Sequence, residues 1–149
     1  MRALRKLRDM DWADRGLVLE ALLWLGVARL ALLVVPFKQI APRLGRHMAK
    51  TGTDLGPYPE DVVLRIGWSV RTVARRSPWN STCLTQAIAA HMMLQRRGIP
   101  STLYLGMAKG EAGEWQAHAW LRCGPHVLTG EPGHRRFVVV STLAKPGGL

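Results

Sequence analysis

The stretch PWNSTCLTQAIAAHMMLQRRG, residues 78–98, predicts a single helix with a cysteine at its start. Residues 80–82 are asparagine, serine and threonine, which all cap helix N-termini, and Gly98 stands where helices commonly end. Arginines fill the last turn at 96–97, which suits the negative end of the helix dipole. Apolar residues recur at helical spacing: Leu84, Ala87, Ile88 and Leu94. Cys83 therefore lies in the first turn of a helix.

Downstream of this helix the hydrophobic pattern changes to alternation, which is typical of strands. The alternating segments are STLYLGM (101–107), WQAHAWLRC (115–123), HVLTG (126–130) and RRFVVVSTL (135–143). Short turn segments, AKGEAGE, GP and EPGH, separate them. Helices followed by closely spaced strands predict an α+β fold with an antiparallel meander.

Upstream, PEDVVLRIGWSVRTVARR (59–76) has apolar residues at helical spacing, an acidic start and a basic end, and predicts a second helix. Residues 36–60 hold four of the nine prolines and predict a connector with a short basic helix inside it.

The most apolar segment is LVLEALLWLGVARLALLVVPF, residues 17–37, whose length is near the roughly 20 residues that span a bilayer. Glu20 and Arg29 lie inside it, and charges at such depth are rare and costly. The favoured interpretation is a largely buried core helix or two, ended by Pro36. A helix that docks on a partner or lies peripherally on a membrane is the alternative, ahead of a true span.

Length and composition predict one globular chain of 149 residues with two regions. Residues 1–55 form an N-terminal helical region that packs on or docks beside a core of residues 56–149. The net charge of +11 attracts anionic partners, but the basic residues are spread without interleaved aromatics, so no nucleic-acid site is expected. Two cysteines and no evident signal peptide predict a cytoplasmic protein, with membrane association through 17–37 as a variant.

Cys83 is a candidate nucleophile because of its position. The free N–H groups and positive dipole end of a helix favour a thiolate and can hold an oxyanion. A small buried hydrophobe is the more common role of a lone helical cysteine, so position alone does not decide.

His118 lies in the middle of the strand WQAHAWLRC. Alternation places it on the more polar face of that strand, shared with Gln116, Trp120 and Arg122. A rigid strand histidine that faces a helix N-terminal cysteine has the geometry of a thiolate–imidazolium pair.

A third residue should orient the imidazole through its other nitrogen. If residues 124–125 form a two-residue hairpin loop, Cys123 pairs with His126 and Glu131 lies across from His118. A shift of the register by one or two residues would put Gly130 or Thr129 there instead.

The same pairing argues against a metal site and a disulfide. Cys123 and His126 share the face opposite His118, so they cannot easily join Cys83 and His118 around one zinc, and no zinc motif is present. No metal or cofactor is expected. The remaining histidines are assigned no chemistry: His91 is expected to be structural, and His47 and His134 to lie solvated in loops.

These residues together resemble a known family. PWNSTCLTQAIAAHMMLQRRGIPSTLYLGM, a loop and then WQAHAWLRC is similar to the transglutaminase-like cysteine peptidase domain of lasso peptide maturation B proteins. The shared pattern is a Cys-Leu that opens a helix, an Arg-Arg-Gly helix end, a strand, and Ala-His-Ala-Trp. The segment LEALLWLGVARLALLVVPFKQIAPRLGR is similar to the N-terminal region of that family.

The resemblance implies a papain/transglutaminase-like fold and a peptidase that removes the leader from a ribosomally made lasso precursor. It implies Cys83 as nucleophile and His118 as general base, whereas the third position, usually Asp, has only Glu131 nearby. The chain is similar to the split form, which implies a separate small leader-recognition protein as partner, and a separate ATP-dependent cyclase that then closes the macrolactam.

Two other functions remain open from the sequence. A transglutaminase-like site can transfer the acyl group to an amine instead of water. A non-catalytic basic scaffold could bind a partner or a membrane through residues 17–37.

Overall fold

The described α-helices all precede the strands along the chain, except that the two-residue strand β1 lies between α3 and α4. The computed structural model describes residues 12–47, 50, 52, 55–76, 82–130 and 133–145. Its elements are α2 (Trp12–Val34), α3 (Phe37–Leu44), β1 (Arg46–His47), α4 (Glu60–Arg76), α5 (Cys83–Arg96), β2 (Ser101–Lys109), β3 (Trp115–Cys123), β4 (His126–Thr129), the 3-10 helix η1 (Gly133–Arg136) and β5 (Val138–Lys145). The predicted α+β class is confirmed.

Helix α5 begins and ends at residues that the sequence pattern picks out. Thr82 is the N-cap, and its hydroxyl oxygen accepts a hydrogen bond from the Thr85 N–H at 3.2 Å. Gly98 follows the helix with φ 69°, a left-handed conformation that favours glycine. The other two predicted caps, Asn80 and Ser81, lie outside the described residues.

Helix α4 spans the predicted range and buries its predicted apolar stripe, including Val63, Ile66, Val70 and Val73. Gly67 lies on the same face, and an added Cβ there would come within 3.1 Å of the Leu128 side chain. This glycine lets α4 approach strand β4 closely.

The sheet is antiparallel but is not a meander. Its strand order is β1-β5-β2-β3-β4, so the last strand returns to pair with β2, as in the pair Leu103 and Leu143. The predicted meander is therefore right for β2, β3 and β4, which pair in chain order, and wrong for β5. Alternation shows that a segment is a strand, whereas the choice of neighbour depends on where the long connection after β4 leads the chain. Strand β1 has two residues and shows no alternation to detect.

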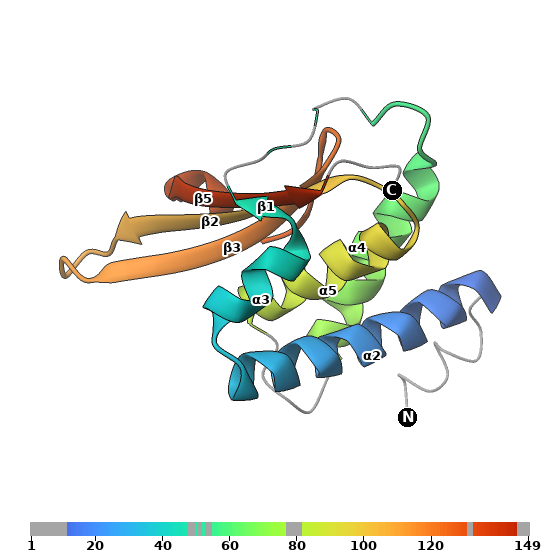
Figure 1. The fold of residues 1–149 in the computed structure, drawn as a ribbon, viewed down its shortest axis with the longest axis horizontal. Coiled ribbons are helices and arrows are strands. Elements are labelled where there is room, and N and C mark those ends of the chain that lie inside the picture. The colour runs from blue at the N-terminus through green and yellow to red at the C-terminus, as the bar shows by residue number, and fades with distance from the viewer. Residues whose placement is uncertain are drawn as a thin grey trace.

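The helices cover one face of this sheet (Figure 1). Buried strand residues on that face belong to the same core as the helices: Leu103, Ala119, Leu121, Cys123 and Leu143. Strand residues that alternate with them, such as Trp120, lie on the opposite face. The sheet thus has a helix-covered face and a second face.

Helix α2 differs from its favoured interpretation. It is one helix that ends before Pro36, and only one side of it is buried, at Leu17, Ala21, Leu25 and Ala28. Only 28% of its most apolar window is buried. The prediction of a largely buried helix is therefore wrong, because α4 and α5 pack against α2 from one side only.

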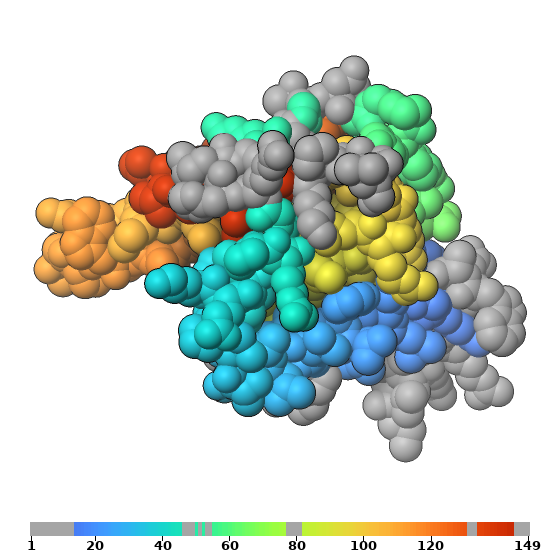
Figure 2. All heavy atoms as spheres, in the orientation of Figure 1, coloured from blue at the N-terminus to red at the C-terminus, as the bar shows by residue number. Residues whose placement is uncertain are grey.

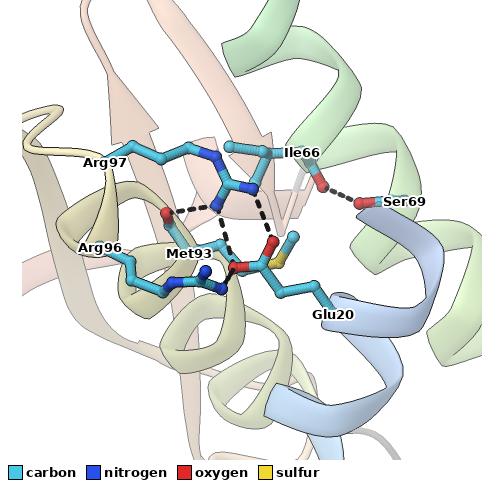
Figure 3. Close-up of polar contacts among 6 residues, drawn as sticks. All are labelled: Glu20, Ile66, Ser69, Met93, Arg96 and Arg97. Carbon is cyan, nitrogen blue, oxygen red and sulfur yellow. Dashed lines mark hydrogen bonds and ion pairs between the residues drawn. The ribbon is translucent and has the colours of Figure 1, made fainter. Parts of the chain in front are cut away.

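A charge cluster fastens α2 to the end of α5 (Figure 3). Arg97 donates to both carboxylate oxygens of Glu20, at 3.0 and 2.6 Å, and Arg96 donates to one of them at 2.8 Å. Burial raises the pKa of Glu20, but the hydrogen bonds and charges of the two arginines outweigh burial, so the pKa lies below its ordinary value. This carboxylate therefore stabilises the folded chain when it is ionised.

We predict that Glu20→Gln lowers the free energy of unfolding by about 1 kcal/mol at neutral pH, because two arginines at the surface lose the charge of the acceptor that they share. The folded pKa of Glu20 is lowered, so its contribution is present above the ordinary glutamate pKa and is lost as pH falls through the folded pKa. Urea unfolding followed by circular dichroism measures the difference, which should shrink in acid. Glu111→Gln, at an exposed position, is the control, and an equal loss in both variants would contradict the prediction.

Candidate functional site

Cys83 is the first residue of α5 and carries a free, half-buried thiol. It packs against the edge of the hydrophobic core. The Thr82 hydroxyl engages the Thr85 N–H, and the Thr82 carbonyl accepts from the Gln86 N–H at 3.0 Å. Among the described residues no acceptor engages the N–H groups of Cys83 and Leu84, as is usual in the first turn of a helix. The thiol therefore lies beside free backbone donors that suit an oxyanion.

His118 is held in place in the middle of β3. Its Nε2 lies 2.8 Å from the Gly130 carbonyl oxygen, which can only accept, so Nε2 carries the proton and donates. The ring stacks on Phe137 at a centroid distance of 4.9 Å and on Trp120 at 5.8 Å. In the neutral ring this tautomer leaves Nδ1 as the basic nitrogen.

An aromatic layer surrounds His118 on the second face of the sheet. Trp120 stacks on Tyr104 with ring centroids 5.4 Å apart, and the Arg122 Nε–H donates to the Tyr104 hydroxyl at 2.9 Å. Gly106, the β2 partner of His118, leaves room for this layer, since an added Cβ would lie 2.8 Å from Phe137 and from the Trp120 ring. The imidazole is thus wedged among packed rings.

Cys83 and His118 lie on α5 and β3, two elements that pack against each other. His118 alternates along β3 with Ala119 and Leu121, which pack on the helix-covered face, so it lies on the other face. Within the described part of the chain, no hydrogen bond joins the Cys83 sulfur to either ring nitrogen. The expectation that the strand histidine faces the cysteine stays a prediction, and a reactive pair requires the two side chains to reach hydrogen-bonding distance.

The prediction that Glu131 lies across from His118 requires an unbroken register between β3 and β4. The register is broken, so this prediction is wrong. Cys123 pairs with His126 as predicted, but a bulge then shifts the pairing, so Leu121 lies opposite Thr129. Glu131 itself lies outside the described residues. The orienting partner of His118 that the structure describes is the main-chain carbonyl of Gly130.

The sequence alone indicates Gly130 only as a residue that a shifted strand register would place across from His118. Its φ is 87°, and an added Cβ would lie 2.6 Å from the Trp120 Cβ and 2.7 Å from the Ala119 carbonyl oxygen. Only glycine fits there without displacement. A glycine is visible in the sequence, but no sequence signal says that its carbonyl reaches an imidazole. The Thr129 hydroxyl is buried without a hydrogen-bond partner among the described residues.

Cys123 is a core residue. Its thiol is buried, lies 3.4 Å from the Pro100 carbonyl oxygen and donates to it. Burial raises the pKa of Cys123 to about 11, against a smaller lowering by the Arg122 charge. Both cysteines are free, as expected. Groups of three or more histidine, cysteine or carboxylate side chains that suit a metal ion are absent from the described residues.

His91 is structural, as predicted. It is buried in α5, its Nδ1 lies 2.5 Å from the Ser101 hydroxyl, and its Nε2 contacts the Leu44 carbonyl oxygen. The Nε2 of His126 lies 3.0 Å from a carboxylate oxygen of Glu60 and donates a hydrogen bond to it.

The prediction that the last two histidines lie in loops is wrong. His134 belongs to η1, its ring lies 5.8 Å from Trp120, and its Nδ1 is buried. The backbone of His47 belongs to β1 and pairs with Leu143, so it is not in a loop. Alternation cannot reveal a 3-10 turn or a two-residue strand, because neither is long enough to show a period.

Comparison with known proteins gives one match. A family model described as the transglutaminase-like superfamily matches residues 31–142, which include α5 and the whole of β2, β3 and β4. No curated protein and no solved structure matches significantly.

We predict that iodoacetamide modifies Cys83 at least about tenfold faster than Cys123 in the folded protein, because the thiol of Cys123 is buried and neutral near pH 7. Mass spectrometry of tryptic peptides after timed quenching measures both rates. In denaturant the two rates should converge. Equal rates in the folded protein would contradict the assignment of Cys123 to the core.

We also predict that Gly130→Ala destabilises the chain by about 1–3 kcal/mol and releases His118, because the new methyl group collides with Trp120. Nitrogen-15 NMR of the imidazole should then report a mixture of tautomers in place of the Nε2–H form. Gly113→Ala is the control, since Gly113 has φ 82° but open space around its Cβ position. If that variant changes the tautomer equally, the Gly130 contact is not what orients the ring.

Proposed function

Because the chain belongs to the transglutaminase-like superfamily, we propose that it is a cysteine peptidase that cleaves the leader from a ribosomally synthesised lasso precursor peptide. The superfamily includes cysteine peptidases and acyltransferases. The observation that carries the proposal is the position of Cys83, half-buried at the first residue of a capped helix beside unengaged backbone N–H groups. The resemblance of the cysteine and Ala-His-Ala-Trp segments to lasso maturation proteins supports the substrate class.

In the proposed reaction the Cys83 thiolate attacks the carbonyl carbon at the leader–core junction. The carbonyl oxygen becomes an oxyanion, which the N–H groups of the first turn of α5 stabilise. The tetrahedral intermediate then breaks its C–N bond, and protonated His118 gives its proton to the leaving amine of the core peptide. The leader remains attached to Cys83 as a thioester.

His118 then acts as a base in the second half of the reaction. Its Nδ1 removes a proton from water, whose oxygen attacks the thioester carbonyl and releases the leader carboxylate and the thiolate. The Gly130 carbonyl, at 2.8 Å from Nε2, holds the ring in the Nε2–H tautomer and stabilises the imidazolium. A backbone carbonyl thereby takes the orienting role that a carboxylate has in other triads.

Closure of the site is a requirement of this proposal. Cys83 and His118 lie on elements that pack together, α5 and β3, and no hydrogen bond joins their side chains among the described residues. Catalytic hydrogen bonds often tighten only when substrate binds. We propose that the bound leader, presented by a separate small recognition protein, accompanies this closure, and that the freed core amine then goes to a separate cyclase.

Mass spectrometry of a lasso-type precursor, incubated with the chain with and without a leader-recognition protein, tests the reaction. Hydrolysis leaves a leader with a free carboxylate, whereas acyl transfer leaves a leader bonded to an amine. We predict that Cys83→Ala abolishes product and that Cys123→Ala, at the buried thiol, retains it. Product formation by Cys83→Ala at the wild-type rate would exclude a nucleophilic cysteine and favour a non-catalytic scaffold.

We predict that His118→Ala lowers kcat by about 10²- to 10⁴-fold, the usual contribution of a general acid–base. Because the described orienter is a backbone carbonyl, Glu131→Gln should retain kcat within about tenfold of wild type. Steady-state rates on a quenched leader–core peptide measure both. A larger loss of kcat from Glu131→Gln than from His118→Ala would contradict the assignment of His118 as the general acid–base and of the Gly130 carbonyl as its orienting partner.

A further inference from the structure

Helix α2 has a second apolar face that points to solvent. Seven aliphatic side chains are between 38% and 69% exposed there: Leu19, Leu22, Leu23, Val27, Leu30, Leu33 and Val34. Their spacing of three and four residues places them on one stripe, since a helix turns about 100° per residue. Figure 2 shows α2 at the surface of the molecule, beside α3 and α5. Exposed apolar surface that is continuous in this way marks an interaction site.

The opposite face of the same helix packs on the domain. Leu17, Ala21, Leu25 and Ala28 are buried, and α2 contacts both α4 and α5. By length and hydropathy α2 could cross a membrane, but a crossing would expose this buried face and break the Glu20 cluster. A helix that lies flat on a membrane surface keeps this face buried and the Glu20 cluster intact.

The exposed stripe is bordered by positive charge. Arg29 lies next to it on α2, Arg43 of α3 lines the same cavity as the stripe residue Val27, and Lys38 is exposed on α3. The acidic side chains described on α2 are both paired: Asp14 lies 3.8 Å from Arg65, and Glu20 is held by Arg96 and Arg97. The chain as a whole has a net charge of +11. The border of the stripe therefore favours an anionic surface.

An apolar groove extends the stripe. A cavity of about 390 Å³ opens between α2, α3 and α5, and Val27 belongs both to its lining and to the stripe. Trp24, Ile40 and Met92 line it, with Arg43 among the lining residues. The apolar surface of the stripe thus continues into a cavity whose lining includes Arg43.

We propose that this face of α2 docks on an anionic lipid bilayer, with the helix lying in the plane of the membrane surface. The seven stripe residues are aliphatic and offer no side-chain hydrogen-bonding group, which suits acyl chains better than a protein interface with its hydrogen bonds. The basic border then meets the phosphates of the headgroups. The proposal does not depend on the reaction at Cys83.

Flotation of the full chain with vesicles tests this. One set contains phosphatidylcholine and phosphatidylglycerol at about 3:1, and the other contains phosphatidylcholine alone. We expect the chain to float with the anionic vesicles, to float poorly with the neutral ones, and to be released as salt rises from about 0.1 M to about 1 M.

Two double variants test whether vesicle binding depends on the stripe or on any exposed apolar residues. Leu23→Gln with Leu30→Gln removes two stripe residues, 64% and 61% exposed, and should weaken partitioning by about tenfold or more. Leu64→Gln with Val138→Gln removes two exposed apolar residues elsewhere and should leave partitioning unchanged. Both positions of each pair are exposed, so thermal unfolding should confirm that both double variants fold.

Three results would overturn the proposal. The first is flotation that is equal for the stripe variant, the control variant and wild type. The second is equal binding to neutral and anionic vesicles at every salt concentration. The third is a dimer, or a complex with a leader-recognition protein, that dissociates in the stripe variant while no vesicle binding occurs, since a protein would then be the occupant of this face.

Discussion

Helix α5 packs against strand β3 on one side and helix α2 on another, and its position depends on a buried histidine. His91 bonds through one ring nitrogen to Ser101 at the start of β2 and through the other to the Leu44 carbonyl at the end of α3. A buried imidazole with both nitrogens satisfied allows little rotation or sliding of the helix that carries it. The placement of Cys83 at the edge of the core follows from this anchoring.

The site combines the N-terminal end of helix α5 with strand β3, which pack against each other. Cys83 belongs to the helix-covered side, whereas His118 lies in an aromatic layer with Trp120 and Phe137 on the second face. The layer and the Gly130 carbonyl hold the imidazole in one tautomer. The proposed reaction therefore requires closure, because a thiolate and an imidazole react as a pair only within hydrogen-bonding distance.

Helix α2 has one face buried in the core and one face exposed to solvent. Its inner face packs against α5, and the carboxylate of Glu20 meets two arginines at the end of that helix. Its outer face carries only aliphatic side chains in the exposed stripe. One helix therefore has two apolar faces, one packed on the domain and one exposed, which explains why its hydropathy alone resembles a membrane span.

The sequence by itself determined the local features of this protein. Helix α5, its cysteine, its C-terminal Gly98, helix α4, and the pairing of Cys123 with His126 follow from spacing and from turn residues that act within a few positions of each other. The tertiary structure decided what depends on distant segments. Strand β5 pairs with β2, a bulge at Leu128 breaks the count toward Glu131, and the Gly130 carbonyl reaches His118. It also decided which side of α2 is buried, because a helix with two apolar faces does not encode which of them its neighbours will cover.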